Sequence, residues 1–289
     1  MSLSWPYHFV SLSKEEIQRR RNALDLRGYY AQLSALAVIA AISLYRLYHK
    51  GHLTRRTPTK RSWWDLPPFQ GWAETRKQYS IVLLWLVFLL GLSLWNTGDD
   101  YLHLTKALAH VSLSQLPFQM LLAPNPFIFP SNPALPSLLS SLTSIPQTAL
   151  APYHRLFGRL IIVPLLCGHG ILYLLFYVQS AHPVFGTLLA KRLRDRDVQC
   201  GLVGLATALL VVIFGRSTLW RLRSLQWPSL SSVDARRQVF YIGHLALVTA
   251  LLALAYAHVV YARPFVIEAV GVSMANSVYC WLLVETRRT

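Results

Sequence analysis

Long apolar runs recur along the whole chain, and short polar segments separate them. Each run has the length of about 20 residues that an α-helix needs to cross a hydrocarbon core of about 30 Å. We expect such helices at residues 28–48, 79–96, 104–123, 152–178, 198–215, 238–261 and 265–284. The pattern therefore predicts an all-α polytopic membrane protein with about seven transmembrane helices.

The segments beside these runs define the expected organisation of the chain. The run at 104–123 is the weakest span, because Lys106, Pro117 and other polar residues interrupt it. The N-terminal segment lacks the apolar core and cleavage site of a secretory signal, so we expect the first span to act as an uncleaved signal. We expect a non-membrane arm at 1–27, three spans at 28–123 with a basic cytosolic loop at 49–78, an uncharged loop at 124–151, a transmembrane core at 152–284 and a short basic tail at 285–289.

Composition and charge agree with this organisation. Hydrophobic residues make up 54% of the chain and charged residues 14%, which is too apolar for an ordinary soluble domain. The formal net charge of +16 would suit a nucleic-acid partner, but the basic residues form short clusters between the apolar runs. We interpret them as charges that hold helix ends in the cytosol under the positive-inside rule. On this interpretation the odd-numbered spans run inward, the C-terminus is cytosolic, and no nucleic acid is bound.

Other common chemistry-bearing patterns are missing from the sequence. Cys167, Cys200 and Cys280 lie in or beside separate apolar runs without paired spacing, so we expect small buried residues rather than disulfides or zinc ligands. The sequence has no phosphate-binding loop and no dinucleotide fingerprint. No residue stands out as a catalytic acid, base or nucleophile.

Two of the expected spans each carry a pair of histidines. His154 and His169 are fifteen residues apart, and His244 and His258 are fourteen apart. At about 100° per residue, these steps return to within about 60° and about 40° of the same helix face. At about 1.5 Å per residue, the members of a pair are about 21 to 22 Å apart along the helix. Each pair therefore places one histidine toward each leaflet.

This arrangement predicts two haems. Ionisable residues inside a membrane span are costly, so they usually face a partner or a cavity. Imidazole is a good ligand for iron, and a haem between two helices takes one axial ligand from each. We therefore expect two b-type haems stacked across the membrane, with four iron ligands: His154, His169, His244 and His258.

The residues next to these histidines fit the same interpretation. Gly168, Gly170 and Gly243 would let a flat macrocycle approach the backbone. Basic residues near the expected cytosolic helix ends could pair with haem propionates, although ordinary anchoring of helix ends explains them equally well: Arg155, Arg159, Arg236 and Arg237. His103 and His110 have no matching partners, and we expect His182 in a turn.

Two segments of the chain resemble the ferric reductase and NADPH oxidase superfamily. The stretch "PYHRLFGRLIIVPLLCGHGILY" is similar to the first histidine helix of that family, and "RRQVFYIGHLALVTALLALAYAH" is similar to the second. "QLPFQMLLAPNP" and "YCWLLVETRR" add weaker support. A GYY segment before the first helix and a basic RRTP loop after it resemble the fungal metalloreductase branch, which includes yeast NADPH oxidase-like proteins.

The resemblance implies transmembrane electron transfer. Family members pass electrons from NADPH through FAD to two haems, and then to ferric or cupric ion or to oxygen. Carried over by motif position, His154 with His244 would hold the inner haem, and His169 with His258 the outer haem. The fungal branch implies the endoplasmic reticulum or the plasma membrane, and membrane lipid surrounds the chain.

Two departures from the family pattern matter. The first histidine pair is usually fourteen residues apart, whereas here it is fifteen. Either a kink or bulge at Pro164 absorbs the extra residue, or the outer haem site is distorted and His169 is the ligand in doubt. Full reductases also continue into an FAD- and NADPH-binding domain, and this sequence stops at Thr289. As an oxidoreductase, the chain would need that domain, or a separate flavoprotein or quinol, as its electron donor.

Two alternatives remain open at this stage. The chain could be a haem-free or truncated subunit, or a regulator, of a full-length oxidase. It could also be a transporter or channel that uses its membrane histidines for protons. That alternative predicts further acidic residues inside the spans, and Glu268 is the one such residue in the sequence.

Overall fold

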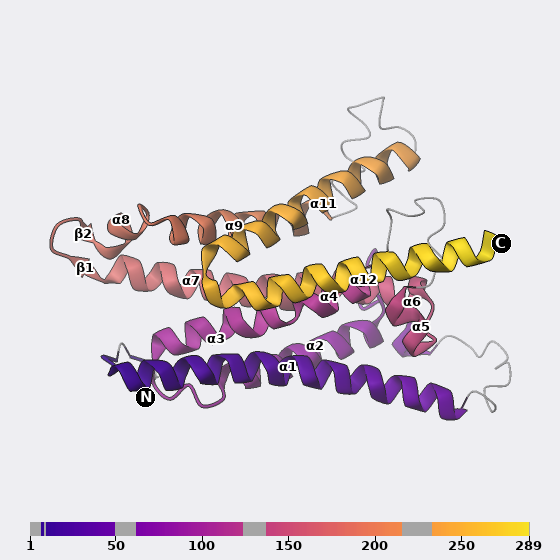
Figure 1. The fold of residues 1–289 in the computed structure, drawn as a ribbon, viewed down its shortest axis with the longest axis horizontal. Coiled ribbons are helices and arrows are strands. Elements are labelled where there is room, and N and C mark those ends of the chain that lie inside the picture. The colour runs from indigo at the N-terminus through magenta and orange to yellow at the C-terminus, as the bar shows by residue number, and fades with distance from the viewer. Residues whose placement is uncertain (1–6, 9, 50–61, 124–136, 216–232, 289) are drawn as a thin grey trace. The chain divides into compact units, whose positions relative to one another are not determined.

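The computed structural model describes residues 7–8, 10–49, 62–123, 137–215 and 233–288, with the backbone alone at 233–237, 284, 287 and 288. It is built almost entirely of helices (Figure 1). Six of them are long and apolar enough to cross a membrane: Lys14–His49, Arg76–Leu94, Gln147–Gln179, Arg196–Phe214, Gln238–His258 and Val260–Leu283. The chain is an all-α, multi-pass membrane protein, as the hydrophobic pattern predicts.

The weakest expected span is broken into two helices. Residues 104–123 fall in α3 (Tyr101–Ser114) and α4 (Leu116–Leu122), which meet at Gln115. Pro117 stands in the first turn of α4, where its missing N–H leaves no helical hydrogen bond unmade. Because Pro117 cannot continue the hydrogen-bond ladder of α3, the chain ends one helix and begins another.

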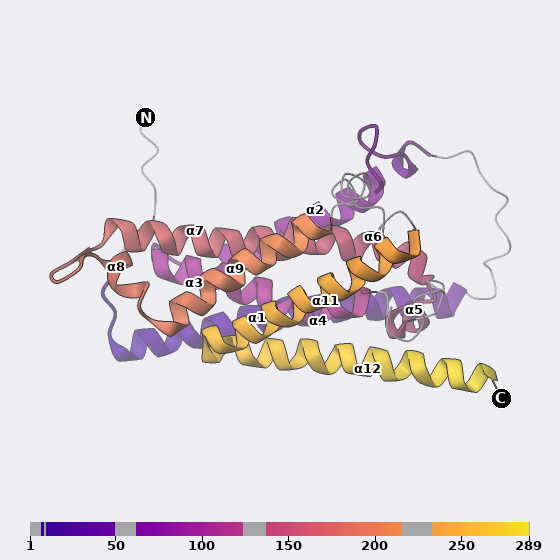
Figure 2. The same ribbon diagram turned by 90° about the horizontal axis from the view of Figure 1, so that it is seen from above.

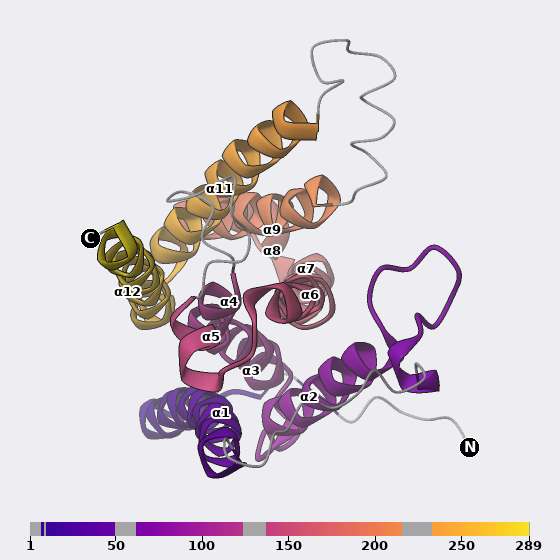
Figure 3. The same cartoon turned by 90° about the vertical axis from the view of Figure 1, so that its right-hand side faces the viewer.

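The chain forms two compact units, and unit 1 contains residues 1–162 and 268–289. Viewed nearly end on in Figure 3, α3 lies between α1 (Lys14–His49) and α2 (Arg76–Leu94), and it contacts both. A capping box of Thr75 and Gln78 starts α2. The other elements of unit 1 are η1 (Trp63–Asp65), α4, α5 (Leu138–Thr143), α6 (Gln147–Phe157), the π-helical turn η2 (Gly158–Ile162) and the greater part of α12 (Arg263–Arg288).

Three of the expected non-membrane segments contain helix where the structure describes them. Helix α1 begins at Lys14, within the expected arm at 1–27. Helices α5 and α6 occupy much of the described part of the expected loop at 124–151. Helix α12 continues to Arg288, within the expected tail at 285–289. A hydropathy pattern marks apolar runs, so it does not mark helical stretches that are polar or short.

Unit 2 contains residues 163–267. In it α9 (Arg196–Phe214) contacts both α7 (Val163–Gln179) and α11 (Val233–His258), and Figures 1 and 2 show α9 and α11 side by side. The turn expected at His182 is a short hairpin of β1 (Ala181–His182) and β2 (Gly186–Thr187). Within it, the His182 ring accepts hydrogen bonds from the N–H groups of Val184 and Phe185. The unit is completed by α8 (Leu188–Arg192), η4 (Val260–Ala262) and the start of α12.

Candidate functional site

Unit 2 brings together the two histidines expected at the outer haem. His169 on α7 and His258 at the end of α11 face each other with ring centres 6.5 Å apart and ring planes at 75°. With metal–nitrogen bonds of about 2 Å, the centres of two imidazole rings on opposite sides of one metal ion are about 6 Å apart. The observed separation is therefore compatible with two axial ligands of one iron.

The orientation of His258 leaves one ring nitrogen available for a metal. Its Nδ1 lies 2.6 Å from the main-chain carbonyl oxygen of Asp197. Because a carbonyl can only accept a hydrogen bond, Nδ1 carries the proton and Nε2 keeps its lone pair. Histidines that bind metals commonly donate their second N–H to a carbonyl or carboxylate in this way.

A glycine on α9 makes this contact possible. Gly201 lies one helical turn after Asp197, and a Cβ atom added at Gly201 would stand 2.6 Å from Cε1 of His258. Any side chain at this position would displace the imidazole from the Asp197 carbonyl. Gly201 therefore permits the close approach of the ring to α9.

Aromatic and charged residues surround this histidine pair. The ring of Tyr173 lies 5.0 Å from that of His169, and Tyr177 follows at 5.4 Å from Tyr173. Arg192 on α8 forms ion pairs with Asp195 at 2.6 Å and with Asp197 at 3.3 Å. Asp197 thus joins α8 through its carboxylate and His258 through its carbonyl oxygen.

In unit 1, His154 has the same kind of orientation. Its Nδ1 lies 3.1 Å from the carbonyl oxygen of Gln119, so Nδ1 is again the donor. The Gln119 side chain returns a hydrogen bond of 3.1 Å to the carbonyl oxygen of His154. The last carbonyls of a helix have no partner inside it, and α4 ends at Leu122, so α6 supplies donors for them. Gln147 donates to the carbonyl oxygen of Leu122 in the same manner.

The helix that carries His154 and His169 contains a π-helical turn, η2, between them. A π-turn accommodates one residue more than an α-helical turn does. Pro164 lies two residues after the end of η2 and lacks an N–H, which favours such an irregularity. The hydroxyl of Ser112 donates to the carbonyl oxygen of Ile162 at 3.0 Å and satisfies a main-chain group of the turn. The extra residue between the two histidines is thus accompanied by a π-turn in the same helix.

His244 lies in unit 2 on α11, in an aromatic environment. The ring of Phe240 stacks on that of His244 at 5.3 Å, and Phe214 of α9 stacks on Phe240 at 6.1 Å. A Cβ atom at Gly243 would meet the Phe214 ring at 2.5 Å, and one at Gly170 would meet Leu205 at 2.6 Å. These two glycines therefore serve close packing against α9, a role that their position beside a histidine did not reveal.

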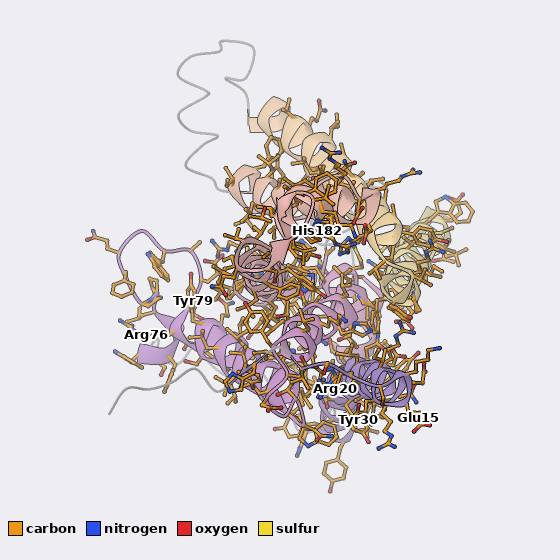
Figure 4. All side chains as sticks on the ribbon, turned by 90° about the vertical axis from the view of Figure 1, so that its left-hand side faces the viewer. Glu15, Arg20, Tyr30, Arg76, Tyr79 and His182 are labelled. Atoms are coloured by element: carbon orange, nitrogen blue, oxygen red, sulfur yellow. The ribbon has the colours of Figure 1, made fainter. Side chains whose placement is uncertain are left out.

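Arg155 and Arg159 converge on a buried carboxylate that sequence analysis missed. Nε of Arg155 lies 2.9 Å, and Nη2 of Arg159 lies 3.2 Å, from the same oxygen of Glu74. The Glu74 side chain is only 5% exposed, and the hydroxyl of Tyr79 lies 3.4 Å from its other oxygen. Figure 4 shows Tyr79 beside Arg76 at the start of α2, just after the loop that supplies Glu74. The side chains of Arg236 and Arg237 lie outside the described part of the chain.

These contacts predict a pH effect on stability. Burial raises the pKa of Glu74, but the hydrogen bond from Arg155 and the charges of both arginines outweigh it, so the pKa lies below the ordinary value of 4.5. Because the folded-state pKa is lowered, the stabilisation is complete above pH 4.5 and is lost as the pH falls through the folded-state value. In detergent, we expect wild type to have a higher melting temperature than Glu74→Gln near neutral pH. The two should converge on acidification, and a constant difference down to strongly acidic pH would contradict this expectation.

The other membrane histidines of unit 1 are held in polar contacts. His103 accepts a hydrogen bond of 3.0 Å from Arg27, whose side chain is fully buried, and His110 lies 3.1 Å from Asp25. His103 must be neutral to accept this hydrogen bond, because the guanidinium of Arg27 can only donate.

The described residues contain no group of three or more His, Cys, Asp or Glu side chains that could hold a metal ion. A bare metal ion would need such a group, whereas a haem brings four equatorial nitrogens and needs only two protein ligands. The facing imidazoles of His169 and His258 fit this requirement. The guanidinium of Arg155, whose side chain is 46% exposed, fits a further acceptor such as a propionate beside Glu74.

Comparison with known proteins identifies the family of the chain. No curated protein and no solved structure matches the chain significantly. Residues 108–255, about half of the chain, match a protein family described as "Ferric reductase like transmembrane component". This match covers α6, α7, α9 and most of α11, including His154, His169 and His244. The chain therefore belongs to the family of ferric reductase-like transmembrane components.

Proposed function

We propose that this protein moves electrons across a membrane through two b-type haems, as a metalloreductase or a superoxide-generating NADPH oxidase does. Membership of the ferric reductase-like family supports the transfer of electrons across the membrane. The observation that carries the proposal is the facing pair of His169 and His258, with ring centres 6.5 Å apart. In this proposal they hold the outer haem, and His154 with His244 hold the inner one.

The residues of the chain hold these ligands in a fixed tautomer. The carbonyl oxygens of Gln119 and Asp197 accept the Nδ1 protons of His154 and His258, so in this tautomer Nε2 carries the lone pair that iron would take. When bound, a haem supplies an iron that alternates between two oxidation states, and its potential depends on ligands, hydrogen bonds and burial. The apolar rings of Phe240 and Phe214 stack in series beside His244.

The electron donor and acceptor lie outside the described chain. We propose a flavoprotein, with FAD and NADPH in a further domain or a separate partner, or a quinol, as the donor. The acceptor is a ferric or cupric ion or oxygen at the outer side, and the reaction there is outer-sphere electron transfer. The endoplasmic reticulum or the plasma membrane is the proposed location, following the resemblance to the fungal branch.

A reduced-minus-oxidised visible spectrum of the purified full chain tests the proposal. With dithionite as reductant, we expect the bands of low-spin b haem and a stoichiometry of about two haems per chain, because each haem takes two axial histidines. Folded helical protein that is purified in the presence of haem and still contains none would overturn the proposal. That result would favour the alternative of a haem-free subunit or regulator.

A further inference from the structure

A charge triad with a buried carboxylate lies next to His154 in unit 1. The carboxylate of Glu74 contacts the guanidinium groups of Arg155 and Arg159, which follow His154 on the same helix. The two arginines each carry one positive charge and Glu74 carries one negative charge, so the triad keeps one net positive charge. The position of this charge suggests a role beyond that of a surface ion pair.

Stability alone does not account for the triad. Burying a carboxylate is costly, and ion pairs that are buried are often no more stabilising than apolar residues in their place. The Glu74 side chain is 5% exposed, while that of Arg155 is 46% exposed and can reach a second anion. Nη2 of Arg159 is buried, and within the described residues the anion that it approaches is Glu74, at 3.2 Å. The triad therefore has capacity for one more anionic acceptor.

We propose that Glu74 is a positioning residue that sets the charge beside the inner haem: it neutralises one of the two arginines after His154 and leaves one positive charge for a single haem carboxylate. This inference rests on the proposed function. With one propionate bound, the two arginines and the two carboxylates are balanced. Glu74 thereby keeps the reduction potential of this haem lower than two unpaired arginines would, because nearby positive charge favours the haem state with one more electron.

The other charged groups of this region are engaged elsewhere. The guanidinium of Arg76 lies 4.4 Å from the ring centre of Trp63 and donates to the carbonyl oxygen of that residue. Asp65 lies in the same loop as Glu74, but it is exposed and caps η1 together with Ser62. Asp65 is therefore a matched control, because its removal changes the net charge of the loop by the same amount but in a solvent-screened position.

Spectroscopic redox titration of haem-loaded variants tests the inference. Glu74→Gln should raise the ratio of reduced to oxidised haem at one site several-fold at a fixed ambient potential, up to about tenfold, which equals about 59 mV for a one-electron couple. Arg159→Gln should shift the same haem in the opposite direction. The double variant Glu74→Gln/Arg159→Gln restores the net charge of one, so its potential should return close to that of wild type. Asp65→Asn should leave both potentials unchanged.

The outcomes separate this inference from the function on which it rests. A wild-type protein without haem would refute the proposed function. Two haems whose potentials are the same in wild type, Glu74→Gln and Arg159→Gln would refute the role of Glu74 alone. Shifts of the same sign in both single variants, without recovery in the double variant, would show disturbed packing rather than charge and would also refute it.

Discussion

Replacing His258 with alanine is expected to remove one of the two haems and to leave the other in place. Alanine offers no ligand to iron, and the opposite imidazole of His169 alone holds a haem weakly. The haem content should fall from about two to about one per chain, with the low-spin spectrum reduced by half. Pyridine haemochromogen assays and reduced-minus-oxidised spectra of purified protein measure both quantities.

The pairing of histidines makes a sharper prediction. If His169 and His258 ligate the same iron, His169→Ala should remove the same haem, and the double variant should lose no more than either single variant. His182→Ala is the control, because His182 lies in the β1–β2 hairpin and accepts hydrogen bonds from main-chain N–H groups there. Loss of both haems in the double variant, but of one in each single variant, would contradict the assigned pairing. Circular dichroism and gel filtration identify any variant that fails to fold.

Replacing Gly201 with alanine is expected to have nearly as large an effect on the same haem. The added methyl group would lie 2.6 Å from Cε1 and 2.8 Å from Nδ1 of His258, well inside van der Waals contact. The imidazole is held at the Asp197 carbonyl by a hydrogen bond of 2.6 Å, so it cannot move aside without losing that contact. We expect loss of one haem, or its conversion from low spin to high spin, seen by absorption and electron paramagnetic resonance.

The same helix offers a matched control for this variant. Gly204 lies less than one turn further along α9, and a Cβ atom there would meet Leu254 at 3.6 Å, an ordinary contact. Gly204→Ala makes the same chemical change on the same helix, so it should keep both haems. Equal spectra for the two variants would show that Gly201 does not govern the position of His258.

The sequence predicts the membrane spans well because hydropathy reports directly on burial in lipid. At Pro117 it predicts a weak single span and not two helices. The position at which the second helix begins depends on the packing of its first turn. Spacing along one helix also identified the four histidines. Their geometry relative to each other was not accessible, because distance between helices depends on which faces pack.

Contacts between distant segments are the part that the sequence did not reveal. Glu74 is an acidic residue in a loop, and its pairing with Arg155 across more than eighty residues of chain leaves no local signal. The carbonyl oxygens of Gln119 and Asp197 are present in every residue, so no residue type marks them. The spacing of fifteen residues, with Pro164 nearby, did signal the π-turn η2, because an irregular helix is the local response to an insertion.

His154 and His258 both donate their Nδ1 protons to main-chain carbonyls rather than to carboxylate side chains. A carboxylate partner makes a metal-bound imidazole more basic than a neutral carbonyl partner does. The imidazole then donates more electron density to the metal. A carboxylate side chain can also be removed by a single substitution, whereas a peptide carbonyl cannot. The tautomers of His154 and His258 are therefore protected against point mutation at Gln119 and Asp197, and they can be lost only when the backbone itself moves.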